Sequence, residues 1–144
     1  MSVTFTVPGQ PVAKGRPKFA RQAGFVRAYT PEKTVAYETL VKLAAGEAMA
    51  GDPPMQGPLS LMLRLYLAIP KSTTKRDRAA IVAGYFLPTK KPDIDNVLKA
   101  VTDAMNGIVY EDDAQLVTVM VVKQYSDTPR AEVGVMRAVE PVAA

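Results

Sequence analysis

Four aspartates flank one short apolar-periodic segment of this chain. Asp93 and Asp95 stand before it, and Asp112 and Asp113 follow it. Like charges repel unless solvent or a cation offsets them, so these acids either lie apart in water or hold a positive ion. The whole chain is basic, with 18 Lys and Arg against 14 Asp and Glu. The acidic stretch, residues 91–115, is therefore the candidate catalytic region.

The residue types that are missing restrict the chemistry of such a site. The sequence has no Cys and no His, which excludes disulfides, thiolate nucleophiles, Ser-His-Asp triads and the usual zinc ligand sets. Any metal must then be bound by oxygen, which favours Mg²⁺, Mn²⁺ or Ca²⁺. Any general base must be a carboxylate, a lysine or a water on a metal.

Two interpretations of the aspartates are open. Asp is favoured at helix N-caps and in first turns, which explains one of Asp93 and Asp95, and Asp112 with Asp113 fits a solvated turn before a strand. Alternatively, the helix dipole keeps the first pair ionised, and the second pair reaches it if the helix and the next strand pack antiparallel. Such an oxygen cage would bind Mg²⁺, which can activate a water and neutralise charge on a phosphodiester.

Lys99 lies four residues after Asp95 and four before Asp103. An exposed i,i+4 ion pair contributes only about 0.3–0.5 kcal/mol, and the spacing by itself slightly favours that simple explanation. The functional alternative is a cation on the same side of the helix as Asp95, placed to contact a phosphate.

Positive charge is concentrated at the N-terminus. Residues 1–31 contain five basic residues and no acid, whereas the other 113 residues carry 13 basic and 14 acidic groups. A localised basic segment is typical of proteins that bind a polyanion, most often nucleic acid. Its aromatics, Phe19, Phe25 and Tyr29, are expected to pack in the core rather than stack on bases. The candidate DNA-binding residues are Lys14, Arg16, Lys18, Arg21 and Arg27.

Hydrophobic periodicity predicts the elements that position these residues. Strands are expected at 3–7, 59–69, 116–125 and 131–135, with a long loop to about residue 29. Helices are expected from a Thr30 N-cap to about residue 48, from a Ser72 or Thr73 cap to about residue 82, and from Asp93 or Asp95 to 106–107. The order β-α-β-α-α-β-β predicts a single α+β domain over residues 1–144, with helices packed on a mixed sheet that ends in a C-terminal antiparallel hairpin.

No apolar run reaches the roughly 20 residues that span a bilayer, and the first residues lack the pattern of a signal peptide. We therefore expect no membrane contact and a cytoplasmic protein.

The segment DIDNVLKAVTDAMNG at 93–107, followed by YEDDAQ at 110–115, resembles the signature of the RusA family of Holliday-junction resolvases. KGRP at 14–17 and YTP at 29–31 are also similar to that family, so the resemblance spans nearly the whole chain. It implies a small homodimeric endonuclease, dependent on Mg²⁺ with Mn²⁺ as a substitute, that nicks four-way DNA junctions symmetrically in recombination and repair and associates with the nucleoid.

The resemblance also assigns roles to individual residues. It makes Asp93, Asp95 and Asp113 the metal-binding catalytic acids, with Asp112 a neighbouring acid, and it gives Lys99 a catalytic role. The alternative is a non-catalytic DNA-binding module of the same fold, in which the acids serve only as helix caps and turns.

Overall fold

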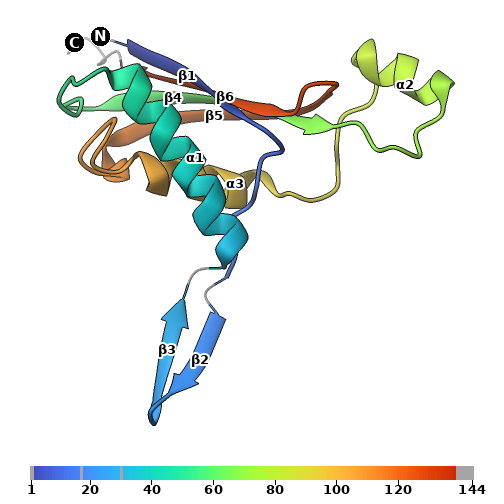
Figure 1. The fold of residues 1–144 in the computed structure, drawn as a ribbon. Helices are drawn as coiled ribbons and strands as arrows, with labels where there is room; N and C mark the ends of the chain where they lie inside the picture. The colour runs from blue at the N-terminus through green and yellow to red at the C-terminus, as the bar shows by residue number, and fades with distance from the viewer. Residues whose placement is uncertain (1, 17, 30, 139–144) are drawn as a thin grey trace.

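A computed structural model describes residues 2–16, 18–29 and 31–138 (Figure 1). The α+β class with helices on a mixed sheet is confirmed, and none of the described helices is long and apolar enough to cross a membrane. The elements are β1 (Ser2–Pro8), β2 (Lys18–Gln22), β3 (Phe25–Tyr29), α1 (Glu32–Met49), β4 (Leu59–Ala68), α2 (Lys75–Val82), α3 (Ile94–Met105), the 3-10 turn η1 (Asp113–Gln115), β5 (Leu116–Ser126) and β6 (Arg130–Arg137).

The main sheet has the strand order β1-β6-β4-β5, in which only the β4–β5 pair is parallel. The predicted C-terminal hairpin is therefore wrong: a tight turn joins β5 and β6, but β4 lies between them. The apolar content of β4 explains this. Every odd residue from Leu59 to Leu67 is a buried leucine, and a central position with a neighbour on each side gives that strand the most complete cover.

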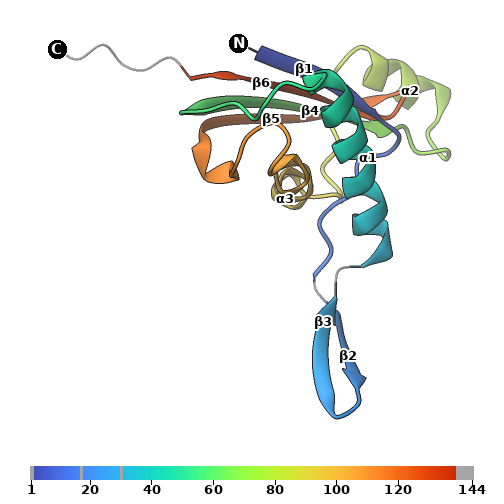
Figure 2. The same cartoon turned by 60° about the vertical axis from the view of Figure 1, so that its left-hand side comes forward.

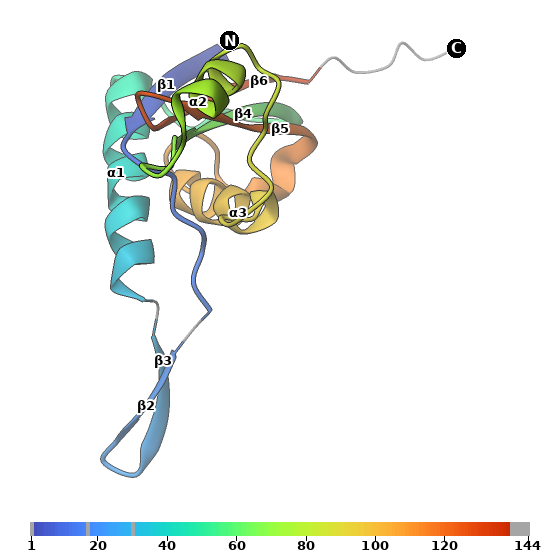
Figure 3. The ribbon, with the colours of Figure 1, turned by 90° about the vertical axis from the view of Figure 1, so that its right-hand side faces the viewer.

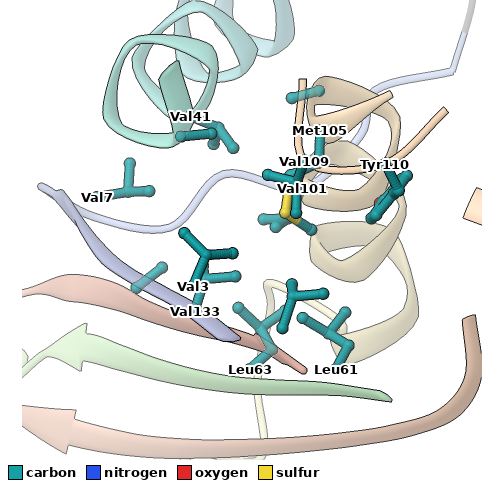
Figure 4. Close-up of a cluster of buried hydrophobic side chains, with 14 of the residues drawn as sticks. Val3, Val7, Val41, Leu61, Leu63, Val101, Met105, Val109, Tyr110 and Val133 are labelled. Atoms are coloured by element: carbon teal, nitrogen blue, oxygen red, sulfur yellow. The ribbon is translucent and has the colours of Figure 1, made fainter. Parts of the chain in front are cut away.

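Helices α1 and α3 pack on the same side of this sheet, as two of the views show (Figures 1 and 2). The core lies between them and the sheet, where Val41 and Met105 meet Leu63 and Val133 (Figure 4). The apolar stripe that helical spacing predicts for α1, from Tyr37 through Leu40 to Ala48, is partly displaced, because Leu40 is 42% exposed whereas Ala45 and Met49 are buried. The helix contacts both β1 and α3, and its buried face follows those two neighbours.

The loop expected before residue 29 contains a β-hairpin, formed by β2 and β3. The hairpin projects away from the rest of the protein beyond the start of α1 (Figures 1, 2 and 3). Phe19 and Phe25 are 71% and 75% exposed, so the expectation that these aromatics pack in the core is wrong. The two-residue turn is Ala23-Gly24, with φ of 48° and 82°. Hairpin turns of this kind usually carry Asn-Gly or Asp-Gly, and the missing signal explains why the hairpin was not predicted.

Helix boundaries differ from expectation by one or two residues. Pro31 has an extended backbone and precedes α1, while Thr30 lies outside the described residues. The N-cap of α2 is Thr74, not Ser72 or Thr73, because the Thr74 hydroxyl accepts the Asp77 N–H at 3.1 Å. Helix α3 begins directly after Asp93, as predicted.

Candidate active site

A hollow of about 350 Å³ opens between α3, η1 and β5. Helix α3 supplies residues three, four and seven positions apart, a spacing that places them on one face of a helix. The turn η1 and the first residues of β5 supply the other wall. The lining residues are Asp95, Leu98, Lys99, Thr102, Asp103, Asp113, Leu116 and Val119.

Three of the predicted catalytic residues therefore share one hollow: Asp95, Lys99 and Asp113. Two predicted acids do not line it. Asp93 is the N-cap of α3, although its side chain makes no capping hydrogen bond. Asp112 is the N-cap of η1, where its N–H donates to Gln115 Oε1 at 3.2 Å and its carbonyl accepts the Gln115 N–H at 3.0 Å. Asp112 thus has a structural role that accounts for its position.

The donor set fits a hard divalent cation. Asp95 and Asp113 offer only carboxylate oxygens, the ligands that Mg²⁺ and Mn²⁺ prefer. As the side chains stand, no three acids within the described ranges form a group that could hold a metal ion. A bound cation would therefore draw its remaining ligands from water, from substrate phosphate or from a rotated side chain.

Lys99 pairs with Asp103, an acid that belongs to a wider ion-pair network. Its Nζ lies 3.5 Å from Oδ2 of Asp103, which is the i,i+4 pair that the spacing predicted. The same Asp103 oxygen lies 3.4 Å from Nζ of Lys14, and Lys14 also pairs with Glu38. Because Asp103 is shared by two lysines, its charge is largely compensated, and the Lys99 side chain remains 64% exposed beside the hollow.

The N-terminal arm passes close to the start of α3. The Lys14 N–H donates to the Asn96 carbonyl at 2.8 Å, and the Gly15 N–H donates to the Thr34 hydroxyl at 2.9 Å. A Cβ on Gly15 would come within 2.7 Å of the Pro31 ring, so the close approach requires glycine. The arm is thus fixed between α1 and α3.

The environment of Lys14 differs from that of a free DNA-binding cation. Partial burial disfavours its charge, but the hydrogen bonds and charges of Glu38 and Asp103 outweigh burial and raise the pKa of Lys14. Its side chain is only 22% exposed. Arg16 and Arg21 are exposed, and the side chains of Lys18 and Arg27 lie outside what the structure describes. Sequence reasoning treated these five cations alike, whereas the structure gives Lys14 an internal role.

Sequence reasoning missed Asn106, which it interpreted only as a helix end. The Asn106 Oδ1 accepts the backbone N–H of Asp113 at 2.9 Å, and its Nδ2 lies 3.4 Å from the Asp113 carboxylate. Gln115 was also missed: it accepts the N–H groups of Glu111 and Asp112 and donates to the carbonyls of Met55 and Gly57. These contacts fix η1, and with it Asp113, to the end of α3 and to the segment before β4.

Lys123 on β5 fixes the other approach to the site. Its Nζ donates to the carbonyls of Lys90 and Pro92, at 2.9 and 3.1 Å. Both residues lie within three positions of Asp93, so β5 holds the loop that leads into α3. A lysine inside an apolar strand was the available signal in the sequence, because its charge requires a polar partner.

A buried tyrosine lies under the acidic hollow. Tyr110 is fully buried (Figure 4), and its hydroxyl donates to the Thr102 carbonyl at 2.8 Å. Burial raises the pKa of Tyr110, and the charges of Asp113, Asp103 and Asp112 raise it further. The phenol is therefore neutral near physiological pH, and it ties the residues just ahead of η1 to α3.

Comparison with known proteins covers the whole of this site. The family model described as "Endodeoxyribonuclease RusA" matches residues 8–136. The chain is also 38% identical over 133 residues to "Uncharacterized protein YqaN" of Bacillus subtilis (strain 168), an alignment that covers 91% of this chain and 93% of that protein. Both matches include the basic arm, α3 and η1.

Proposed function

The chain belongs to the RusA endodeoxyribonuclease family, and on that basis we propose that it is a Mg²⁺-dependent, structure-selective endonuclease that resolves four-way DNA junctions. One observation carries the proposal: Asp95, Asp113 and Lys99, which come from α3 and η1, line one hollow. Carboxylates and a cation that face the same space suit a phosphodiester, whose hydrolysis needs both metal ligands and stabilisation of negative charge.

Each residue has a distinct proposed role. Asp95 and Asp113, with Asp93 at the N-cap of α3, would hold the metal. When bound there, Mg²⁺ supplies charge neutralisation on the phosphate and activation of water. Lys99 donates to a phosphate oxygen and stabilises charge in the transition state, and Asp103 holds its ammonium group at the edge of the hollow.

The basic arm supplies the proposed contacts with the DNA backbone. Arg16 follows directly on the segment fixed against α3, so a phosphate that it binds would lie near the acidic hollow. Arg21 extends this positive charge onto the hairpin. Backbone contacts of this kind set position and register and do not read sequence. We place the activity on recombining or damaged DNA, in the cytoplasm with the nucleoid.

The direct test is cleavage of a synthetic four-way junction by the full chain, with and without Mg²⁺, beside a linear duplex of the same length. We expect cleavage of the junction alone, only with Mg²⁺ or Mn²⁺. Asp95→Asn and Asp113→Asn should abolish cleavage and keep junction binding, because an amide is a poor metal ligand that no longer repels phosphate. Asp52→Asn, an exposed acid in the turn after α1, is the control and should cleave normally. Normal turnover by both site variants would refute the metal assignment.

One observation favours a rival function, a DNA-binding module without catalysis. No three acids among the described residues already form a metal-binding group, as would be expected if they served only as caps and turns. The rival predicts tight junction binding with no cleavage at any Mg²⁺ or Mn²⁺ concentration. It also predicts that Asp113→Asn leaves binding unchanged in the presence and absence of Mg²⁺.

A homodimer is the proposed assembly, because symmetric resolution needs two nicks and the described residues form one acidic hollow. A C₂ dimer supplies two sites with matching symmetry. Apolar surface for the interface could come from the Tyr37-Leu40-Ala44 face of α1 or from the strand edges. Tyr37 is buried, while Leu43 on α1 and Val117 on the edge strand β5 are 60% and 63% exposed. Light scattering at micromolar concentration tests the oligomeric state, and cleavage of a cruciform plasmid tests whether the two nicks are paired. Linear product supports paired nicks. A monomer that yields only nicked circles would refute the dimer.

A further inference from the structure

Helix α2 stands apart from the rest of the fold. It lies beyond the ends of β4 and β5, away from α1 and α3 (Figures 1 and 3), and none of its residues is buried. An isolated helix of fewer than about 12 residues is marginal in water, and this one has eight. Because none of its side chains is buried, packing of the core does not explain why this segment forms a helix.

The segment that contains α2 is strongly basic. Residues 70–92 carry six basic side chains and one acid, Asp77. Arg78 pairs with Asp127 in the turn between β5 and β6, which ties the helix to the sheet. Within the described residues, no carboxylate pairs with Lys71, Lys75 or Arg76, and all three are exposed. This second concentration of positive charge is separate in the sequence from the N-terminal arm.

The residue that follows the helix is an exposed aromatic on a fixed backbone. The Gly84 N–H donates to the Ile81 carbonyl and the Tyr85 N–H to the Ala80 carbonyl, with Gly84 at a φ of 87°. This pair of bonds is a Schellman motif, in which the residue after the glycine usually packs back on the helix. The Tyr85 side chain is instead 82% exposed. Its backbone is thus held in place while its ring faces solvent.

The same segment is coupled to the acidic hollow. It continues through Lys90 and Pro92 into Asp93, and Lys123 anchors that connection to β5 with two hydrogen bonds. A ligand held by α2 would therefore have a defined position relative to the start of α3.

We propose that α2 and Tyr85 form a second DNA-contacting element, in which Lys71, Lys75 and Arg76 bind backbone phosphates and Tyr85 stacks on a base whose face is exposed at the branch point. The inference rests on the proposed function and adds a partner surface to it. These three exposed cations, which no described carboxylate pairs with, are complementary to a polyanion. An exposed aromatic beside them can stack on a base face that the branch point exposes, whereas a continuous duplex keeps its bases stacked on one another.

The test uses the full chain in EDTA, so that binding is measured without cleavage, on a four-way junction and on a linear duplex. Lys75→Gln/Arg76→Gln should reduce the slope of log K against log salt by about two for both DNAs, since each phosphate contact contributes about 0.9. The matched control is Lys42→Gln/Arg137→Gln, which removes two exposed charges from α1 and from the far end of β6, and its slope should not change. Because α2 buries no side chain, the variants are expected to fold normally, which circular dichroism checks.

The role of Tyr85 is tested separately, by comparing the affinity of its variants for the junction and for the duplex. Tyr85→Ala should weaken junction binding by about 5- to 150-fold, the value of stacking one base, and leave duplex binding unchanged. Tyr85→Phe should keep junction binding at the wild-type level, and Met136→Ala, which changes an exposed apolar residue on β6, should have no effect.

The outcomes separate this inference from the function on which it rests. Wild-type protein that cleaves junctions while the α2 variants bind with unchanged slope and affinity would overturn the role of α2 alone. A wild-type chain that binds no junction would overturn both. A change in oligomeric state by light scattering, with unchanged DNA affinity, would show that α2 contacts protein instead.

Discussion

Asn106 offers the most specific test of how the fold positions the proposed metal site. Its side chain makes two contacts with Asp113: an acceptor contact with the backbone N–H at 2.9 Å and a longer one to the carboxylate at 3.4 Å. A hydrogen bond such as the first contributes about 1 kcal/mol, and the second, at that length, contributes little. Asn106→Ala should therefore lower the equilibrium constant for holding Asp113 in place by about fivefold.

The effect should be limited, because Gln115 still holds η1 to the carbonyls of Met55 and Gly57. We expect the Mg²⁺ concentration for half-maximal junction cleavage to rise by about five- to tenfold. This change is at or just below the smallest loss of metal affinity that usually follows removal of a ligand's hydrogen-bond partner. The maximal rate at saturating Mg²⁺ should be nearly unchanged, since no group that contacts substrate is removed.

The assay is single-turnover cleavage of a synthetic junction across a Mg²⁺ titration, with the unfolding free energy measured on the same preparations. Gln56→Ala is the matched control: Gln56 bonds to Glu111 at 3.2 Å in the same region but does not touch Asp113. Its Mg²⁺ dependence should equal that of wild type. An unchanged Mg²⁺ midpoint in folded Asn106→Ala, or a lower maximal rate at the same midpoint, would refute the claim that Asn106 positions a metal ligand.

Two further predictions follow from buried and paired groups. Lys14→Ala should lower the unfolding free energy by about 1–3 kcal/mol, because it leaves Glu38 and Asp103 without their shared cation. The same variant should leave the salt dependence of DNA binding unchanged. Denaturant melts and salt titrations distinguish this structural role of Lys14 from a phosphate contact. Burial raises the pKa of Tyr37 to about 12 from an ordinary value of 10. The folded protein thus keeps a proton that the unfolded chain loses, so stability should fall as pH rises from 10 through 12. The Tyr37 hydroxyl has no hydrogen-bond partner among the described residues, so Tyr37→Phe should be at least as stable at pH 7 and lose less stability at high pH; an equally steep alkaline loss would contradict this.

The regular elements could be predicted because their signals are local. Only neighbouring residues are needed to recognise the alternating leucines of β4 or the apolar stripe of α3. Such patterns predicted the type of these elements, and their boundaries to within a residue or two. The hairpin of β2 and β3 was missed because its Ala-Gly turn lacks the usual residues and none of its side chains that the structure describes is buried. Period-two patterning is informative only where one side of a strand is covered.

The acidic motif was also visible in the sequence, but its arrangement was not. Residues four apart on α3 had to share a face, so Asp95, Lys99 and Asp103 were placed by helix geometry alone. The sequence did not show whether η1 returns to α3 and brings Asp113 to that face. In the structure, Asn106 at the end of α3 accepts the Asp113 N–H and so helps to hold η1 there. The exclusion of Asp112 from the hollow likewise depends on a cap that forms only when the turn does.

By itself, then, the sequence determined which segments are helix or strand, the oxygen-only chemistry of any metal site and the basic character of the N-terminal arm. Only the tertiary structure decided that β4 separates β5 from β6, that Lys14 pairs inside the protein, and that α2 stands free of the core. The reason is physical. Periodicity and residue chemistry act over a few neighbouring residues, whereas strand order, ion-pair partners and exposure are set by burial among segments that lie far apart in the chain.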